Sequence, residues 1–155
     1  MQSVEVFRFV NLVYSSRALR PCRAALEELL FFNPRQYRVR EGIVALQEKF
    51  GPLRLEETGD RLCVRVGNCE AQTLFVYDPA QHRSDPVGVV VFLRTSSAEV
   101  AIMHLAVHPD YSLQGEQAGV GLGIVLVEKV KEIASQIAGI KRVVFLYQRE
   151  LIMRL

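Results

Sequence analysis

The chain has 155 residues, of which half are apolar and 23% are charged, and its formal net charge at pH 7 is +2. These values exclude a disordered, fibrous or collagen-like chain and predict a single domain over residues 1–155 with an ordinary hydrophobic core. The longest apolar run, residues 86–93, is far shorter than the roughly 20 residues that cross a bilayer, and the small net charge predicts no nucleic-acid partner.

The first elements along the chain are a strand and two helices. Alternating apolar residues predict a strand over residues 4–13. Pro21 suits the first turn of a helix that ends before Asn33 and Pro34. The apolar residues on one face of that helix are Cys22, Leu26, Leu29 and Leu30. A second helix is expected over residues 40–50, ahead of Gly51 and Pro52.

Strands dominate the middle of the chain. Apolar patterns predict three strands in an antiparallel meander, over residues 61–66, 73–77 and 87–94. A further strand is expected over residues 98–108, a strong helix from the glycines near 121 to about residue 138, and a last strand over 142–147. This order of elements predicts an α/β (α+β) domain with no internal repeat.

Other charged and reactive residues give weaker signals. Cys22, Cys63 and Cys69 are odd in number and lack CxxC spacing, so we expect free thiols and no metal site; Cys69, in a turn, stays open as a nucleophile without a nearby activating base. The arginines between residues 35 and 40 are interpreted either as a phosphate contact or as a solvated helix face. Charges at positions 5 and 8 interrupt the N-terminal apolar stretch, so we expect no secretory signal and a cytoplasmic protein.

The stretch that indicates chemistry is a strand followed by a glycine-rich loop that opens a helix. Backbone N–H groups at a helix N-terminus have no intrahelical acceptor, and the helix dipole is positive there, so the loop can bind a pyrophosphate without a basic side chain. Two alternatives stay open: the glycines only permit a tight turn, or Gly119, Gly121 and Gly123 belong to a dinucleotide fold. The second lacks the G-x-x-G spacing and comes late in the chain.

In these residues the chain resembles the GNAT superfamily of acyl-CoA-dependent N-acyltransferases. Residues 99–109 are similar to the fourth strand of that family, residues 118–123 to its R/Q-x-x-G-x-G/A loop, residues 86–90 to its third strand and residues 142–147 to its fifth. The resemblance implies a mixed, mostly antiparallel central sheet flanked by helices. It also implies transfer of an acetyl group from acetyl-CoA, as co-substrate, to the amine of an unidentified small molecule or peptide.

The resemblance also implies roles for particular residues. The pantetheine arm would pair with Leu105, Ala106 and Val107, and the pyrophosphate would be held by the loop. The loop residues are Ala118, Gly119, Val120, Gly121, Leu122 and Gly123.

Three residues are candidates for proton transfer. His104 and Glu99 lie on the fourth strand as candidate bases, and Tyr147 near the end of the fifth is a candidate acid for the leaving thiolate. Regular alternation puts His104 and Glu99 on opposite faces, unless a bulge intervenes. Each candidate also has a structural interpretation, as a core histidine, a solvated strand end or an ordinary strand tyrosine.

The chain departs from the family pattern in three places. Ala118 stands where the family has Arg or Gln, the connection from Pro109 to Gly119 is long, and the chain is expected to lack the last helix and two strands. These departures keep open a non-catalytic GNAT-like domain that binds CoA or another protein. An unpaired fifth strand would invite a homodimer by strand addition.

Overall fold

The computed structural model describes residues 12–32, 47–80, 85–111, 121–145 and 151–154. The larger of two sheets contains β1 (Val13–Ser15), β6 (Gln72–Tyr77), β7 (Pro86–Ser96), β8 (Glu99–Val107), β9 (Arg142–Phe145) and β10 (Leu151–Arg154), in the order β1-β6-β7-β8-β9-β10. The smaller sheet has the order β2-β4-β3, with β5 paired to β4. Its strands are β2 (Ala18–Leu19), β3 (Leu53–Thr58), β4 (Arg61–Val66) and β5 (Cys69–Glu70).

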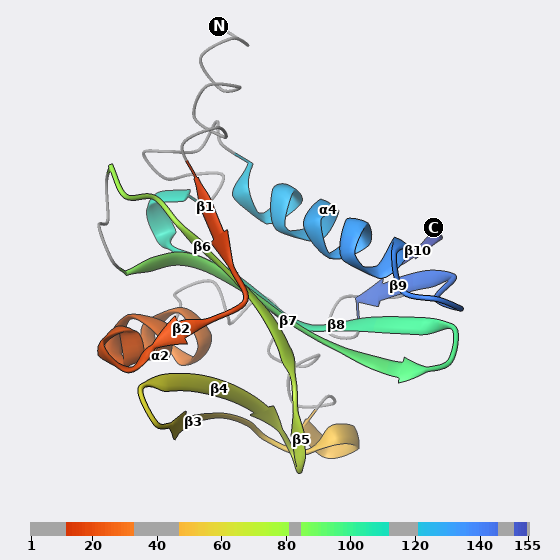
Figure 1. Cartoon of the computed structure of the whole chain (residues 1–155), viewed down its shortest axis with the longest axis horizontal. Helices are drawn as coiled ribbons and strands as arrows, with labels where there is room; N and C mark the ends of the chain where they lie inside the picture. Colours follow the sequence, from red (N-terminus) through yellow and green to blue (C-terminus); the bar gives the residue numbers. More distant parts are fainter. Residues whose placement is uncertain (1–11, 33–46, 81–84, 112–120, 146–150, 155) are drawn as a thin grey trace, which may run out of the picture.

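Helices lie on both faces of the larger sheet (Figure 1). A 3-10 turn, η1 (Arg20–Cys22), leads into α2 (Arg23–Phe31), which packs against β7 and β8. On the other face, α4 (Leu122–Ser135) packs against β7, β8 and β9. The helix predicted to begin near Pro21 and the one predicted after the glycines are therefore confirmed, and their buried residues include Leu26, Leu30, Leu122, Leu126 and Val130.

The apolar run of the sequence forms the central strand of the larger sheet. Residues Pro86 to Phe92 of β7 are all buried, because β6 and β8 pair with its edges while the two helices cover its faces. Gly88 allows α4 to approach closely: a Cβ there would lie 3.2 Å from Leu126 and 2.8 Å from Val76. Buried side chains of both sheets and both helices belong to one core.

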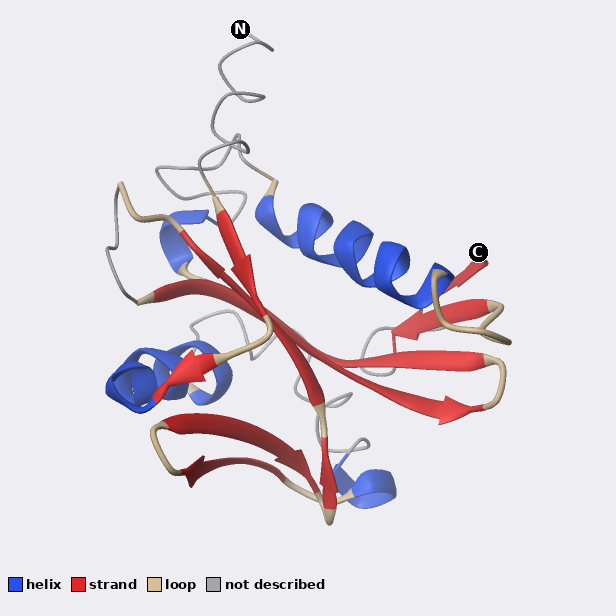
Figure 2. Cartoon of the chain, in the orientation of Figure 1, coloured by secondary structure: helices blue, strands red, loops and turns tan. Residues whose placement is uncertain are grey.

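All pairs in the larger sheet are antiparallel except β8 with β9, which α4 connects. Figure 2 shows the sheet as a twisted layer, with the smaller sheet beneath it beside α2. The structure is thus a mixed α/β fold with a mostly antiparallel central sheet flanked by helices, which confirms the predicted fold class.

Two expectations about strand pairing are wrong. The strand over residues 61–66 does not continue the meander, because β4 pairs with β2, β3 and β5 in the smaller sheet. The fifth strand is not an exposed edge, since β10 pairs with β9 from Leu151↔Phe145 to Arg154↔Arg142. The expected dimerisation by strand addition at β9 therefore loses its basis, because that basis was an unpaired edge of this strand.

Some predicted elements lie wholly or partly outside the described residues. The first predicted strand is described only at its end, where β1 continues to Ser15, and the second predicted helix only over 47–50. The end of the last predicted strand also lies beyond the described part of β9. No helix in the described ranges is long and apolar enough to cross a membrane.

Candidate functional site

The N-terminus of α4 is the first component of the candidate site. Its N-cap is Gly121, with φ 64° and ψ 42°, a left-handed conformation that glycine adopts without the strain a Cβ would bring. No described side chain caps the helix, and its first turn carries no acidic residue. The N–H groups of this turn therefore point toward whatever lies beyond the helix end, as an anion site requires. Ala118, Gly119 and Val120 lie outside the described residues.

Gly123 in the first turn has a different significance. A Cβ built there would meet Leu105 at 3.8 Å, an ordinary van der Waals contact, and the backbone is helical. The packing of the described chain therefore does not require glycine at this position, although glycine costs a helix about 0.5–1 kcal/mol relative to alanine. Close approach of a ligand to the backbone is a physical reason for accepting that cost.

The second component is the carboxyl-terminal half of β8. The described pairing with β9 runs from Glu99↔Arg142 to Ile102↔Phe145, whereas β8 continues to Val107 and pairs with β7 along its other edge. Leu105 lies on the α4 face, where it approaches Gly123, and is partly buried. The structure thus brings the predicted pantetheine residues, Leu105, Ala106 and Val107, next to the described part of the predicted phosphate loop. Ligands of open α/β sheets commonly bind where parallel strands end beside a helix N-terminus.

His104 is buried on the face opposite Leu105. Its cross-strand partner is Val91, and 4% of the residue is exposed. Burial lowers the pKa of the imidazole to about 4, so it is neutral at physiological pH. A register shift between Val91 and Phe92 places a bulge at this point of β8, as the sequence left open. These surroundings favour a packing role over a base that exchanges protons with solvent.

Glu99 lies at the other end of β8 and is held by two donors. Thr95 donates from Oγ1 at 2.6 Å, and Arg142 donates from Nε at 2.9 Å. The hydrogen bond from Thr95 and the charge of Arg142 hold the pKa of Glu99 below its usual value. A carboxylate with a lowered pKa is a weak base, and this one ties β8 to its parallel neighbour. Tyr147, the third candidate, lies outside the described residues.

The start of the loop that follows β8 is anchored by a contact that no sequence pattern indicates. Tyr111, in the 3-10 turn η3 (Pro109–Tyr111), donates a short hydrogen bond from its hydroxyl to Asp78, and both residues are buried. The N–H of His108 donates to the carbonyl of Val87 at 2.7 Å, and that of Tyr111 to the carbonyl of His108 at 2.8 Å. No spacing in the sequence indicates that residues 78 and 111 meet, because the contact joins two separate loops.

The remaining candidates provide no second centre among the described residues. No group of three His, Cys, Asp or Glu side chains there is arranged to hold a metal ion. Cys22 is buried, and burial raises the pKa of its thiol, whereas Cys69 is exposed on β5. A thiol with a raised pKa is a poor nucleophile, so Cys22 is not a candidate catalytic residue.

Comparisons with known proteins give structural similarity alone. No family model and no curated protein matches the chain. Solved structures similar to it include an acetyltransferase from Streptococcus agalactiae 2603, with 14% identity and a TM-score of 0.48 over 87% of this chain and 72% of that one. An IAA acetyltransferase from Bacillus cereus ATCC 14579 shows 20% identity and a TM-score of 0.44 over 86% of this chain.

A protein from Desulfovibrio desulfuricans assigned to the GNAT family of acetyltransferases shows 16% identity and a TM-score of 0.44, over 85% of this chain and 70% of that one. The present chain spans 64% of the length of the Bacillus cereus protein. At these identities the similarity concerns the fold, so function has to be argued from the residues of this chain.

Proposed function

We propose that this chain is an N-acyltransferase of the GNAT type, which moves an acetyl group from acetyl-CoA to the amine of a small molecule or peptide. The observation that carries the proposal is the approach of Gly123, in the uncapped first turn of α4, to Leu105 on the carboxyl-terminal half of β8. A helix N-terminus and a strand edge meet there, as binding of an extended ligand with a pyrophosphate group requires.

The residues fit acetyl-CoA in two respects. The first-turn amides of α4, with those of loop residues 118–121, would hold the pyrophosphate, because no carboxylate in that turn competes for them. The backbone of Leu105, Ala106 and Val107 would hold the pantetheine arm, with the partly buried Leu105 side chain against its apolar part. When bound, acetyl-CoA supplies the acetyl group as a reactive thioester.

The contribution of the chain to the reaction is then mainly positioning. Holding the two reactants in the correct geometry replaces a large part of the entropy cost of their encounter. His104, Glu99 and Tyr147 stay as candidates for proton transfer, but the low pKa of His104 and the ion pair of Glu99 make both poor bases near pH 7. We expect an acceptor that arrives with a neutral amine to react fastest.

A second candidate function is supported by the surroundings of His104 and Glu99. If neither His104 nor Glu99 exchanges protons with an acceptor, the chain binds acetyl-CoA, or a protein partner, without catalysis. A homodimer is compatible with both functions, but its interface would have to be sought elsewhere than at β9, which β10 covers.

Titration of acetyl-CoA, followed by calorimetry and thermal unfolding, tests the proposal. We expect saturable binding and a rise in melting temperature, and no response at millimolar acetyl-CoA would overturn it. A thiol-release assay over a panel of primary amines then separates the two functions. Release that depends on an amine indicates a transferase, whereas binding without release under any amine indicates the non-catalytic domain.

A His104→Gln variant is the control for the role of the imidazole. Because the residue is buried in the core, its thermal unfolding must be measured beside its turnover. Undiminished turnover in a folded variant would remove His104 from the mechanism.

A further inference from the structure

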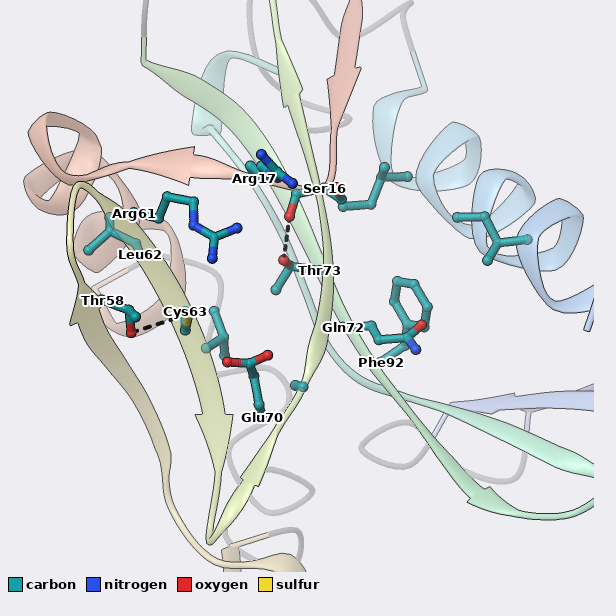
Figure 3. A pocket seen from close by; sticks show the side chains of 14 residues that line it. Ser16, Arg17, Thr58, Arg61, Leu62, Cys63, Glu70, Gln72, Thr73 and Phe92 are labelled. Atoms are coloured by element: carbon teal, nitrogen blue, oxygen red, sulfur yellow. Dashed lines mark hydrogen bonds between the residues drawn. The ribbon is translucent and has the colours of Figure 1, made fainter.

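A cavity of about 340 Å³ lies between the smaller sheet and β6 (Figure 3). Its lining comes from the β1–β2 connection, from β3, β4 and β5, and from β6, Phe92 of β7 and Ile133 of α4. This volume lies at the lower end of the range of about 300–1,000 Å³ typical of small-molecule sites.

The cavity is separate from the proposed acetyl-CoA site. Ile133 lies near the C-terminal end of α4, and Gly123 lies in its first turn. At 1.5 Å per residue the two positions are about 15 Å apart along the helix axis. In addition, neither Leu105 nor its neighbours on β8 line the cavity.

Three charged side chains line this cavity, Arg17, Arg61 and Glu70. Among the described residues none of them has an ion-pair partner. The sheet does pair other charges: Arg65, which is the cross-strand neighbour of Glu70, forms its ion pair with Glu56 at 3.0 Å instead. Arg17, Arg61 and Glu70 thus carry charges that no ion pair among the described residues neutralises, and all three line the same cavity.

The two arginines lie on the same face of the smaller sheet. Leu19 of β2 pairs with Arg61 of β4, so these two residues share a face of the sheet. Arg17 lies two residues before Leu19 and therefore lies on that same face. Figure 3 shows the guanidinium of Arg61 reaching from β4 into the space in front of Thr73, with Arg17 beyond it. Two guanidinium groups that line one cavity favour a carboxylate, which accepts several of their N–H bonds at once.

Glu70 lies at the opposite end of the cavity. It pairs with Arg65, which is roughly 13 Å from Arg61 along β4 at about 3.3 Å per residue. The side chains of Arg61 and Glu70 both line the cavity, and Figure 3 shows them on the same side of β4. Between them on the same face of β4 lies the partly buried Cys63, a small apolar side chain, and the lining includes further apolar residues. A positive end, an apolar middle and a negative end thus follow one another.

We propose that this cavity binds a short linear zwitterion, a molecule with a carboxylate at one end and an ammonium group at the other on an apolar chain. The carboxylate lies between Arg17 and Arg61, the ammonium group lies at Glu70, and the chain packs against Cys63 of β4. An ω-amino acid has this chemistry, as does a dipeptide with a small apolar side chain.

The test uses 6-aminohexanoate as the probe, titrated by calorimetry into the full chain, with hexanoate and hexylamine as analogues that lack one charge each. We expect 6-aminohexanoate to bind and each analogue to bind about tenfold more weakly, because one charge-assisted contact is lost. No detectable binding of 6-aminohexanoate, or equally tight binding of hexanoate, would overturn the proposal.

Two variants locate the site. Arg61→Met keeps most of the side-chain length and should weaken both 6-aminohexanoate and hexanoate, whereas Glu70→Gln should weaken 6-aminohexanoate alone. The control is Arg20→Met, which removes the same charge from an exposed residue outside the cavity lining. Binding that Arg61→Met leaves unchanged would place the ligand elsewhere and refute the assignment. Acetyl-CoA binding should not change in any of these variants, so the two proposals can fail separately.

Discussion

Replacement of Gly123 by alanine should affect folding and ligand binding in opposite directions. The backbone at this position is helical, and the added Cβ meets only Leu105 at 3.8 Å. Alanine is favoured over glycine in a helix by about 0.5–1 kcal/mol. For a chain of this size that gain corresponds to a rise in melting temperature of about 1–4 °C. Thermal unfolding of the ligand-free variant measures it.

The same methyl group should weaken acetyl-CoA binding. A phosphate oxygen that accepts a hydrogen bond from a first-turn amide comes within about 2.9 Å of the nitrogen, where a Cβ on the same turn obstructs it. Loss of one charge-assisted bond costs about 1.5–3 kcal/mol, which is a loss in affinity of about 10- to 100-fold. Calorimetric titration of the variant beside the wild type measures this loss.

Two further glycine variants complete the experiment. Gly121→Ala places a side chain at φ 64°, so it should lower stability by about 1–2 kcal/mol as well as weaken binding. Gly59→Ala, at φ 67° in the β3–β4 turn, should lower stability and leave acetyl-CoA affinity unchanged. Wild-type affinity in Gly123→Ala would refute the close approach of ligand to this turn, and a lower melting temperature would refute the helix argument.

Three other predictions concern buried and paired groups. Tyr111→Phe should lower stability by about 1–3 kcal/mol in chemical denaturation, because it removes a hydrogen bond from the buried Asp78. Glu99→Gln should lower the melting temperature at pH 7 by an amount equivalent to at most about 1 kcal/mol, because the ion pair between Glu99 and Arg142 is partly solvated. The pKa of Glu99 is lowered in the folded state, so the difference between variant and wild type should vanish as the pH falls through that pKa. A difference that stays constant with pH would contradict its origin in the ion pair. His104 has a folded pKa of about 4 and an unfolded value of about 6.5, so wild-type stability should fall by about 3 kcal/mol as the pH drops across that window, and His104→Leu should remove this part of the pH dependence.

Much of the strand and helix content could be predicted because its patterns are local. The buried run of β7, the strand β8 and the apolar face of α4 are all visible as periodicities in the sequence. β3 was missed, although alternating leucines and the Gly59-Asp60 turn before β4 are a hairpin signal. β10 was missed because a strand of four residues has too short a pattern to stand out.

Strand pairing could not be predicted to the same extent. β4 has a pattern that suits a meander with β6, yet it pairs with β2, which lies more than forty residues earlier in the chain. Such a choice depends on which apolar faces are covered by distant elements, here α2 and the two sheets around it. The distribution of paired and unpaired charges around Arg61 and Glu70 follows from that topology, so the cavity had no sequence signal.

In the candidate site, too, local features could be predicted from the sequence better than features that depend on distant residues. The role proposed for Gly121 and Gly123 depends on local backbone conformation, and the structure places both where the glycine pattern indicated, at the start of α4. The roles predicted for His104 and Glu99 depend on their surroundings instead. The same imidazole would titrate near pH 6.5 on a solvated strand, but where it is buried beside Val91 of β7 its pKa is about 4. A motif made of backbone can therefore be predicted from sequence more securely than a catalytic side chain, and binding of acetyl-CoA is the part of the proposed function that should be tested before transfer.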